Sequence, residues 1–225
     1  MKERPIIFNS EMVRAVLEGR KTQTRRIMKN QPVPSKTREG DYWFSCNKMH
    51  SMVHVSDFIP GNCLMPDAHE FFSMSCPFGA VGDRLWVRET WQGPLFDEEQ
   101  LDEFLRDTDP FYTPKYCQYA ADGGPKPEYS DRDDNIRYGW RPSIHMPRWA
   151  SRITLEITGV RVERLASISP DDALAEGYPA ERAADGGHLD PWLWFRGLWD
   201  GIYPEQSFKA NLWVWVIEFK RVEGE

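Results

Sequence analysis

The sequence lacks any long apolar run. No stretch approaches the about 18 consecutive apolar residues that a membrane-spanning helix needs, although 40% of the 225 residues are hydrophobic. The first residues, 1–5, lead directly into a polar segment that predicts a helix, without the apolar region of a signal peptide. We therefore expect a globular protein of the cytoplasm that has no membrane partner.

Cysteine is also sparse, with four residues at irregular spacing. A chain of this length can bury a sizeable core without disulfide staples, so we expect free thiols. The possible zinc ligands are Cys46, His50, Cys63, His69 and Cys76. Of these, only Cys46 and His50 resemble a ligand doublet, and no standard Cys-x-x-Cys pair is present. We therefore expect neither a metal nor a cofactor.

The sequence also has no excess of positive charge. Lysine and arginine number 28 against 35 acidic residues, and the formal net charge is -7. This balance argues against a protein that coats nucleic acid nonspecifically, because such binding depends mainly on neutralising phosphates with Lys and Arg. Any nucleic-acid site must be local. The densest basic run surrounds Thr24 and contains Arg20, Lys21, Arg25 and Arg26, and its alternative interpretation is a solvated cationic face.

Hydrophobic periodicity predicts a mixed α+β chain that is mainly β. A helix begins with Ser10 as its N-cap and closes at Gly19. Further helices are expected at 97–107, from Ser169 to Gly177, and from Asp190, the last burying Leu193, Trp194, Leu198 and Trp199. Alternating residues predict strands at 84–89, 153–162 and 212–221. The strand at 153–162 is expected to bend at Gly159.

Two segments have no sustained period. Residues 28–76 predict an irregular insertion with a short hairpin around 42–45. Residues 121–134, rich in Gly, Pro and Asp, predict a loop. Ten tryptophans are present, and core packing explains most of them, although one or two such as Trp86 or Trp149 can line a base-stacking cleft.

The order of motifs resembles the ASCH family of the PUA-like superfamily. The residues that carry the resemblance are the basic motif Gly19, Lys21 and Arg26, the turn Gly82-Asp83 before a strand, a short acidic helix, and the terminal strand with Val216 to Lys220. The resemblance implies one domain over 1–225, a PUA-like β-barrel with short flanking helices and with insertions at about 28–75 and 92–145. The segment 141–152 is similar to larger ASCH-like proteins of phages and prophages.

In its motifs the chain resembles the bacterial N4-acetylcytidine amidohydrolases. That resemblance implies catalytic roles for Lys21, Thr24 and Glu176. It also implies that Arg26 contacts substrate or phosphate, and we add further candidate nucleoside or nucleic-acid contacts from the basic and aromatic residues near the expected cleft. These are Arg20, Arg25, Trp86, Arg88, His145 and Arg148. Strict strand alternation would place Lys21 and Thr24 on opposite faces, so they converge only if the chain turns between them.

Several functions fit these residues. The first is binding of a nucleoside or nucleic acid with hydrolysis of the amide of an N4-acylated cytosine, which needs a nucleophile, a proton carrier and positive charge near the oxyanion. The second is a non-catalytic reader of modified or single-stranded RNA or DNA. A ribonuclease and a phage accessory interaction protein are further alternatives. Taken singly, Lys21 is also explained as a solvated lysine and Glu176 as an exposed helical residue.

Overall fold

The computed structural model describes residues 1–59, 61–63, 65–130, 135–183 and 186–222. Its elements form an α+β fold with mostly sheet and several short helices, which confirms the coarse fold class predicted from the sequence. Among the described residues, no helix is long and apolar enough to cross a membrane.

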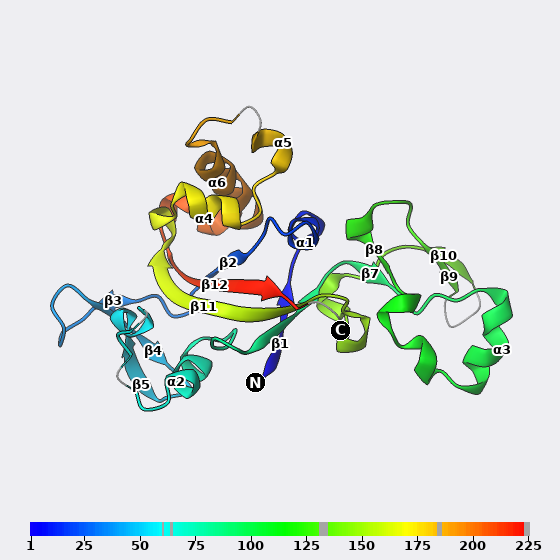
Figure 1. Cartoon of the computed structure of the whole chain (residues 1–225), viewed down its shortest axis with the longest axis horizontal. Coiled ribbons are helices and arrows are strands. Elements are labelled where there is room, and N and C mark those ends of the chain that lie inside the picture. Colours follow the sequence, from blue (N-terminus) through cyan, green and yellow to red (C-terminus); the bar gives the residue numbers. More distant parts are fainter. Residues whose placement is uncertain (60, 64, 131–134, 184–185, 223–225) are drawn as a thin grey trace.

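The centre of the molecule is a five-stranded sheet (Figure 1). In spatial order its strands are β1 (Glu3–Ile7), β6 (Arg84–Arg88), β11 (Thr154–Arg164), β12 (Trp213–Arg221) and β2 (Gln23–Ile27). β1 and β6 are parallel, and the other neighbours are antiparallel. The long strand β11 pairs with β6 along one edge and with β12 along the other, and its pairing with β12 shifts register between Ile157 and Gly159, which confirms the predicted bend.

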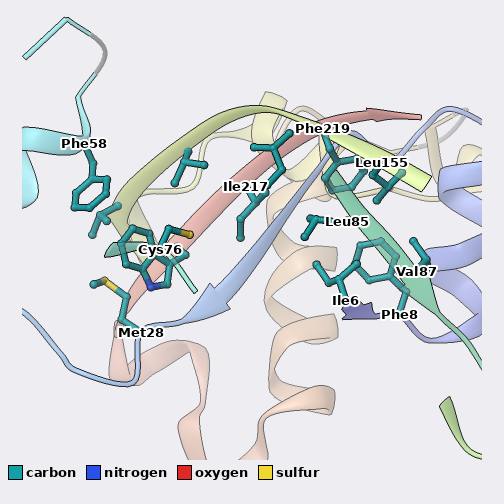
Figure 2. Packing of buried hydrophobic residues seen from close by; sticks show 14 of the residues in the cluster. Ile6, Phe8, Met28, Phe58, Cys76, Leu85, Val87, Leu155, Ile217 and Phe219 are labelled. Atoms are coloured by element: carbon teal, nitrogen blue, oxygen red, sulfur yellow. The ribbon is translucent and has the colours of Figure 1, made fainter. Parts of the chain in front are cut away.

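The main hydrophobic core lies on one face of this sheet. Figure 2 shows Ile6 and Phe8 from the β1 side packed beside Leu85 and Val87 of β6. In β12 the predicted alternation is confirmed, because the odd-numbered residues 213–219 join this core. Val214 and Val216 instead join a second cluster with the helices. A sheet covered on both faces explains why β12 is almost continuously apolar.

Two additional parts flank the sheet on opposite sides in Figure 1. One contains β3 (Val33–Pro34), β4 (Tyr42–Cys46), β5 (Ser51–His54) and α2 (Ala68–Ser75). The other contains β7 (Trp91–Gln92), α3 (Glu98–Arg106), β8 (Gln118–Tyr119), β9 (Glu128–Ser130) and β10 (Ile136–Tyr138). Short 3-10 turns lie at Val55–Phe58, Asp109–Phe111, Pro114–Tyr116, Ala120–Asp122, Ser143–His145, Arg148–Ala150, Leu165–Ser167, Pro204–Gln206 and Phe208–Ala210.

These parts correct two predictions. The segment 28–76 is not irregular throughout, because the hairpin expected near 42–45 is part of a three-stranded sheet, with α2 following it. Its strands are too short for a periodic signal. The loop predicted at 121–134 contains β9, while residues 131–134 lie outside the described residues.

The remaining helices are α1 (Ser10–Leu17), α4 (Pro170–Ala175), α5 (Ala180–Ala183) and α6 (Asp190–Ile202). Asn9, rather than Ser10, is the N-cap of α1, since its side chain accepts from the Met12 amide at 2.8 Å. Ser169 caps α4 as predicted. α6 turns Phe195 into the second cluster and leaves Leu193 53% exposed, so the face predicted for this helix was shifted by part of a turn.

A substitution at Gly177 tests how closely α1 packs against the end of α4. Its φ is +102°, and a Cβ there would lie 2.8 Å from the Ala15 Cβ and 3.2 Å from the Lys21 Cβ. We predict that Gly177→Ala lowers the free energy of unfolding by about 2 to 4 kcal/mol, because backbone strain and overpacking add. Urea unfolding measures the loss.

Gly19→Ala is the matched control. Gly19 also has a positive φ, +76°, but a Cβ there meets no atom within 4 Å. It should cost about 1 kcal/mol from backbone strain alone. Equal losses in the two variants would contradict the steric argument.

Candidate active site

Lys21 enters the site from the end of α1. The helix stops at Glu18, Gly19 takes the left-handed conformation, and the amides of Arg20 and Lys21 both donate to the Ala15 carbonyl at 2.9 and 3.0 Å. This turn directs the chain inward before β2 begins. Lys21 is consequently 2% exposed, so its interpretation as a solvated lysine is wrong.

Glu176 reaches the same place from the end of α4. It is the C-cap residue of that helix, and Gly177 with its positive φ turns the chain away after it. Lys21 and Glu176 form an isolated antiparallel bridge, and the Thr22 amide donates to the Ala175 carbonyl at 2.9 Å. The ends of two helices are thereby joined by main-chain pairing. Glu176 is 3% exposed, and the alternative of an exposed helical residue is also wrong.

The two side chains form a buried ion pair. Lys21 Nζ lies 2.7 Å from a carboxylate oxygen of Glu176 and donates to the Glu176 carbonyl at 2.9 Å. Burial lowers the pKa of Lys21, and the Glu176 carboxylate only partly opposes this shift. A lysine whose neutral form is stabilised in this way can act as a base.

Arg25 holds the other oxygen of Glu176. Its guanidinium donates to that oxygen at 3.1 Å and also lies 3.1 Å from Asp172 and 3.2 Å from Glu163. Although burial opposes the shift, a hydrogen bond from Gln23 and the charge of Arg25 lower the pKa of Asp172. Arg25 is 2% exposed. It therefore lies inside the protein among carboxylates and offers no free surface charge.

Thr24 and Arg26 form the neighbouring wall. Thr24 Oγ1 accepts a hydrogen bond from Arg26 at 3.0 Å, and Arg26 also donates to the Ile7 carbonyl at 2.8 Å. The Phe8 ring supports both cations, with Lys21 Nζ 5.6 Å and the Arg26 guanidinium carbon 5.5 Å from its centroid. Arg26 therefore links β2 to β1, the two edge strands of the sheet.

A narrow slot runs between these residues and α6. It encloses about 10 Å³, which is the space of roughly one water molecule. Its lining residues are Met12, Thr24, Arg25, Arg26, Glu176, Phe195, Leu198, Trp199, Ile202 and Tyr203. Lys21 lies behind Glu176 and does not itself line the slot.

The slot shares lining residues with two larger clefts, and Met12 lines all three spaces. The Arg20 cleft has a volume of about 440 Å³, and it shares Glu176 and Leu198 with the slot. The Arg26 cleft has a volume of about 480 Å³, and it shares Arg26, Ile202 and Tyr203 with the slot. Each is large enough for a small ligand.

The basic run is therefore not a uniform cationic face. Lys21 and Arg25 are buried, while Arg20 lines its cleft, paired with Glu18 and donating to the Gly177 carbonyl at 2.9 Å. The turn at Gly19 and Arg20 precedes Lys21, and from there the side chains alternate: Lys21 and Arg25 face Glu176, whereas Thr24 contacts Arg26. The predicted convergence of Lys21 and Thr24 is thus limited to the residue between them, because Glu176 pairs with Lys21 and lines the slot with Thr24. Sequence reasoning gave no sign of Phe8 or Tyr203, because neither belongs to a motif and each reaches the site only through the fold.

The remaining predicted contacts lie elsewhere. Trp86 and Arg88 alternate with the core residues of β6, so they face away from the core and from Phe8. The Arg88 guanidinium lies over the Trp86 ring at 5.5 Å and donates to the Met146 carbonyl at 3.0 Å. Arg148 is near them, beside β1 and β11, where it pairs with Glu3 and donates to Thr154. His145 is exposed on the adjoining turn. The structure does not bring these four residues to the slot.

The five residues considered as possible zinc ligands do not gather into a metal site. Within the described ranges, no three His, Cys, Asp or Glu side chains gather in a way that could hold a metal ion. All four cysteines are free thiols. Cys76 is fully buried, which raises its pKa to about 12, and His69 lies 3.3 Å from Asp83. A thiol with so high a pKa is a poor source of the thiolate that zinc binds.

Comparison with family models, curated proteins and solved structures finds no match to this chain. The resemblance to the ASCH family therefore stays a prediction that rests on motif residues such as Gly19, Lys21 and Arg26. What the geometry adds is independent of that resemblance, namely a buried Lys21 and Glu176 beside a slot lined by Thr24.

Removal of one partner tests how strongly the buried ions depend on each other. We predict that Glu176→Gln lowers the free energy of unfolding by about 3 to 5 kcal/mol, because it leaves Lys21 and Arg25 buried without their shared carboxylate. Lys21→Met should cost less, since Arg25 still compensates Glu176. Urea unfolding at neutral pH measures both.

Lys220→Met provides the matched control. Lys220 pairs with Glu156 at 3.0 Å, but its side chain is 62% exposed, so its loss should cost less than about 1 kcal/mol. If Glu176→Gln were no more destabilising than Lys220→Met, the buried pair would not hold the site together.

Proposed function

We propose that this protein binds a nucleoside or single-stranded nucleic acid in the Arg26 cleft and hydrolyses the amide of an N4-acylated cytosine at the slot. The observation that carries the proposal is the buried pair of Lys21 and Glu176 next to a slot that Glu176 and Thr24 both line. A nucleophile, a buried lysine and an orienting carboxylate are the parts that amide hydrolysis needs.

The residues suggest a sequence of steps. The Glu176 carboxylate takes the proton of the Thr24 hydroxyl and passes it to neutral Lys21, as the threonine oxygen attacks the acyl carbon. Arg26 stabilises the negative oxygen that forms, since it already donates to Thr24 Oγ1. The C–N bond then breaks as Lys21 returns the proton through Glu176 to N4, which releases the cytosine amine. Water hydrolyses the threonyl ester and releases the carboxylic acid.

The small volume of the slot favours a variant of the same chemistry. With space for roughly one water molecule, the slot can hold a water next to Thr24 and Glu176, and Glu176 relays the proton of that water to Lys21. The base then lies in the Arg26 cleft. That cleft has the mostly apolar lining of a small-ligand site, with Phe78 and Tyr203 available to stack on a base and Arg26 available for polar contact.

The finer fold assignment is part of the proposal. We infer a single ASCH domain with a PUA-like barrel over 1–225, in which the parts around α2 and α3 are insertions. Support comes from the five-stranded sheet, whose edge strands β1 and β2 are linked through Arg26 and the Ile7 carbonyl. Further support is the position of the basic motif directly after α1.

A second candidate is a non-catalytic reader of the same base. Thr24 is fully buried, and Lys21 donates to both the carbonyl and the carboxylate of Glu176, which suits a structural ion pair under a binding cleft. A reader needs the cleft and Arg26 but no neutral lysine. The two functions differ in turnover and in their dependence on pH.

Incubation with N4-acetylcytidine, followed by chromatography of the deacetylated product, tests hydrolysis. We expect turnover by the wild type and a fall of at least about 100-fold in kcat/KM for Lys21→Ala, because a general base contributes 10² or more. Thr24→Val keeps the side-chain volume and removes the hydroxyl, so it measures the contribution of the hydroxyl to turnover and is less prone to misfold than Lys21→Ala. Binding without turnover by the wild type would overturn hydrolysis and favour the reader.

The pH dependence tests the role of Lys21. Because the base must be unprotonated, kcat/KM should rise with pH through the lowered pKa of Lys21. Glu176→Gln should move this limb to lower pH, because the anion that stabilises the ammonium is gone. A kcat/KM that does not rise with pH over the range in which the protein stays folded would remove Lys21 as the base.

A further inference from the structure

The four predicted contacts that lie away from the slot form a separate surface on the far face of β1 and β6. Figure 2 shows that Ile6, Leu85 and Val87 point into the core. Pro5, Ile7, Trp86 and Arg88 alternate with core residues and therefore point the other way. In register, Pro5 lies beside Trp86 and Ile7 beside Arg88. We call Pro5, Ile7, Trp86, Arg88 and Arg148 the outer arginine face.

This face is positively charged in an acidic protein. On and beside it the cations Arg84, Arg88, Arg148 and Lys220 stand against the carboxylates Glu3 and Glu156. A hydrogen bond from Arg148, with the charges of Arg148 and Arg84, lowers the pKa of Glu3. Four cations against two carboxylates leave this part of the surface with a net positive charge, whereas the whole chain has a net charge of -7. Of the arginines in the adjoining segment 135–155, Arg148 lies on this face, whereas Arg152 pairs with Glu89 and Asp122.

The same surface exposes aromatic and apolar side chains. Ile7 is 43% and Ile144 57% exposed, and Trp86 is half-buried. Arg88 is held over the Trp86 ring by the carbonyls of Ile144 and Met146. A fixed guanidinium beside an aromatic ring combines phosphate contact with base stacking, which is the combination that single-stranded nucleic acid requires.

The outer arginine face continues into the Arg26 cleft. Pro5 and Ile7 belong to both, since β1 is an edge strand of the sheet and both residues line the cleft. The Arg20 cleft is a poorer exit for phosphates, because among its described lining residues Glu11, Glu18, Glu176 and Glu181 outnumber Arg14, Arg20 and Arg182. Among the described residues that line the Arg26 cleft, Arg26 carries a charge and the others are uncharged.

We propose that the outer arginine face binds a single-stranded stretch of nucleic acid that leads over β1 into the Arg26 cleft. Where the proposed function holds, on which this part rests, the substrate is a base within a strand and the face binds its neighbours. Phosphates replace Glu3 as the partner of Arg148, and a base stacks beside Trp86. Duplexes fit less well, because their bases are not available for stacking.

Fluorescence anisotropy with labelled, unmodified RNA and DNA strands of about 12 nucleotides tests this surface. We expect Arg148→Gln to weaken binding several-fold and to lower the slope of log affinity against log salt by about 1. Arg148→Lys should restore the slope. Arg38→Gln is the matched control, because Arg38 is 44% exposed against 42% for Arg148 and is likewise ion-paired, with Asp57 at 2.7 Å and Asp41 at 3.8 Å. Its affinity should equal that of the wild type.

The proposal is overturned if the wild type binds neither strand, prefers the duplex, or loses no more affinity with Arg148→Gln than with Arg38→Gln. The RNA and DNA arms identify the strand that is bound. Because the probe carries no acyl group, this result is separate from that of deacylation. Hydrolysis of N4-acetylcytidine without strand binding would contradict the role of the outer arginine face and support the proposed hydrolysis. Strand binding through Arg148 without hydrolysis would support the role of the face and contradict the proposed hydrolysis.

Discussion

One buried carboxylate, that of Glu176, has two cationic partners, and the site depends on it. Lys21 takes one oxygen and Arg25 the other, at 2.7 and 3.1 Å. Ions removed from water are stable only when paired and hydrogen-bonded, so each of the three fixes the others. Glu176 ends α4, while Lys21 and Arg25 lie on either side of the start of β2. The ion pairs therefore hold the helix against the sheet edge.

This arrangement also explains the glycines around it. Gly19 turns the chain from α1 toward Lys21, and Gly177 turns it away after Glu176. Gly177 has a second reason to lack a side chain, because Ala15 of α1 lies directly against it. The helix ends approach so closely that Lys21 can donate to the main-chain carbonyl of Glu176 as well as to its carboxylate. A cation is favourable there, because carbonyls are left unpaired at a helix C-terminus.

The position of β1 gives the molecule its two surfaces. Toward the inside, the β1 side supplies Phe8, which supports Lys21 and Arg26. Toward the outside, it supplies Pro5 and Ile7 beside Trp86 and Arg88. Because β1 is an edge strand, the same few residues border both the Arg26 cleft and the outer arginine face. Successive side chains of one strand can in this way serve a buried site and an exposed surface.

The sequence by itself determined the elements that carry their own local signals. Ser169 and Pro170 marked the start of α4, Gly159 the bend of β11, and the odd-numbered residues 213–219 the core side of β12. These signals are local, since capping and alternation involve residues close together in the chain. Apart from the hairpin expected near 42–45, the short strands of 28–76 and β9 carried no such signal and were missed.

Only the tertiary structure decided which predicted residues meet. Lys21 and Glu176 are far apart in the chain, and their pairing follows from the packing of α1 against α4. Arg25 looked like a surface cation, yet Glu163, Asp172 and Glu176 surround it. Trp86 was grouped with the slot, but strand alternation turns it to the opposite face. Residue types reveal which chemistry is available, whereas burial and long-range contacts decide where each charge lies and what state it takes.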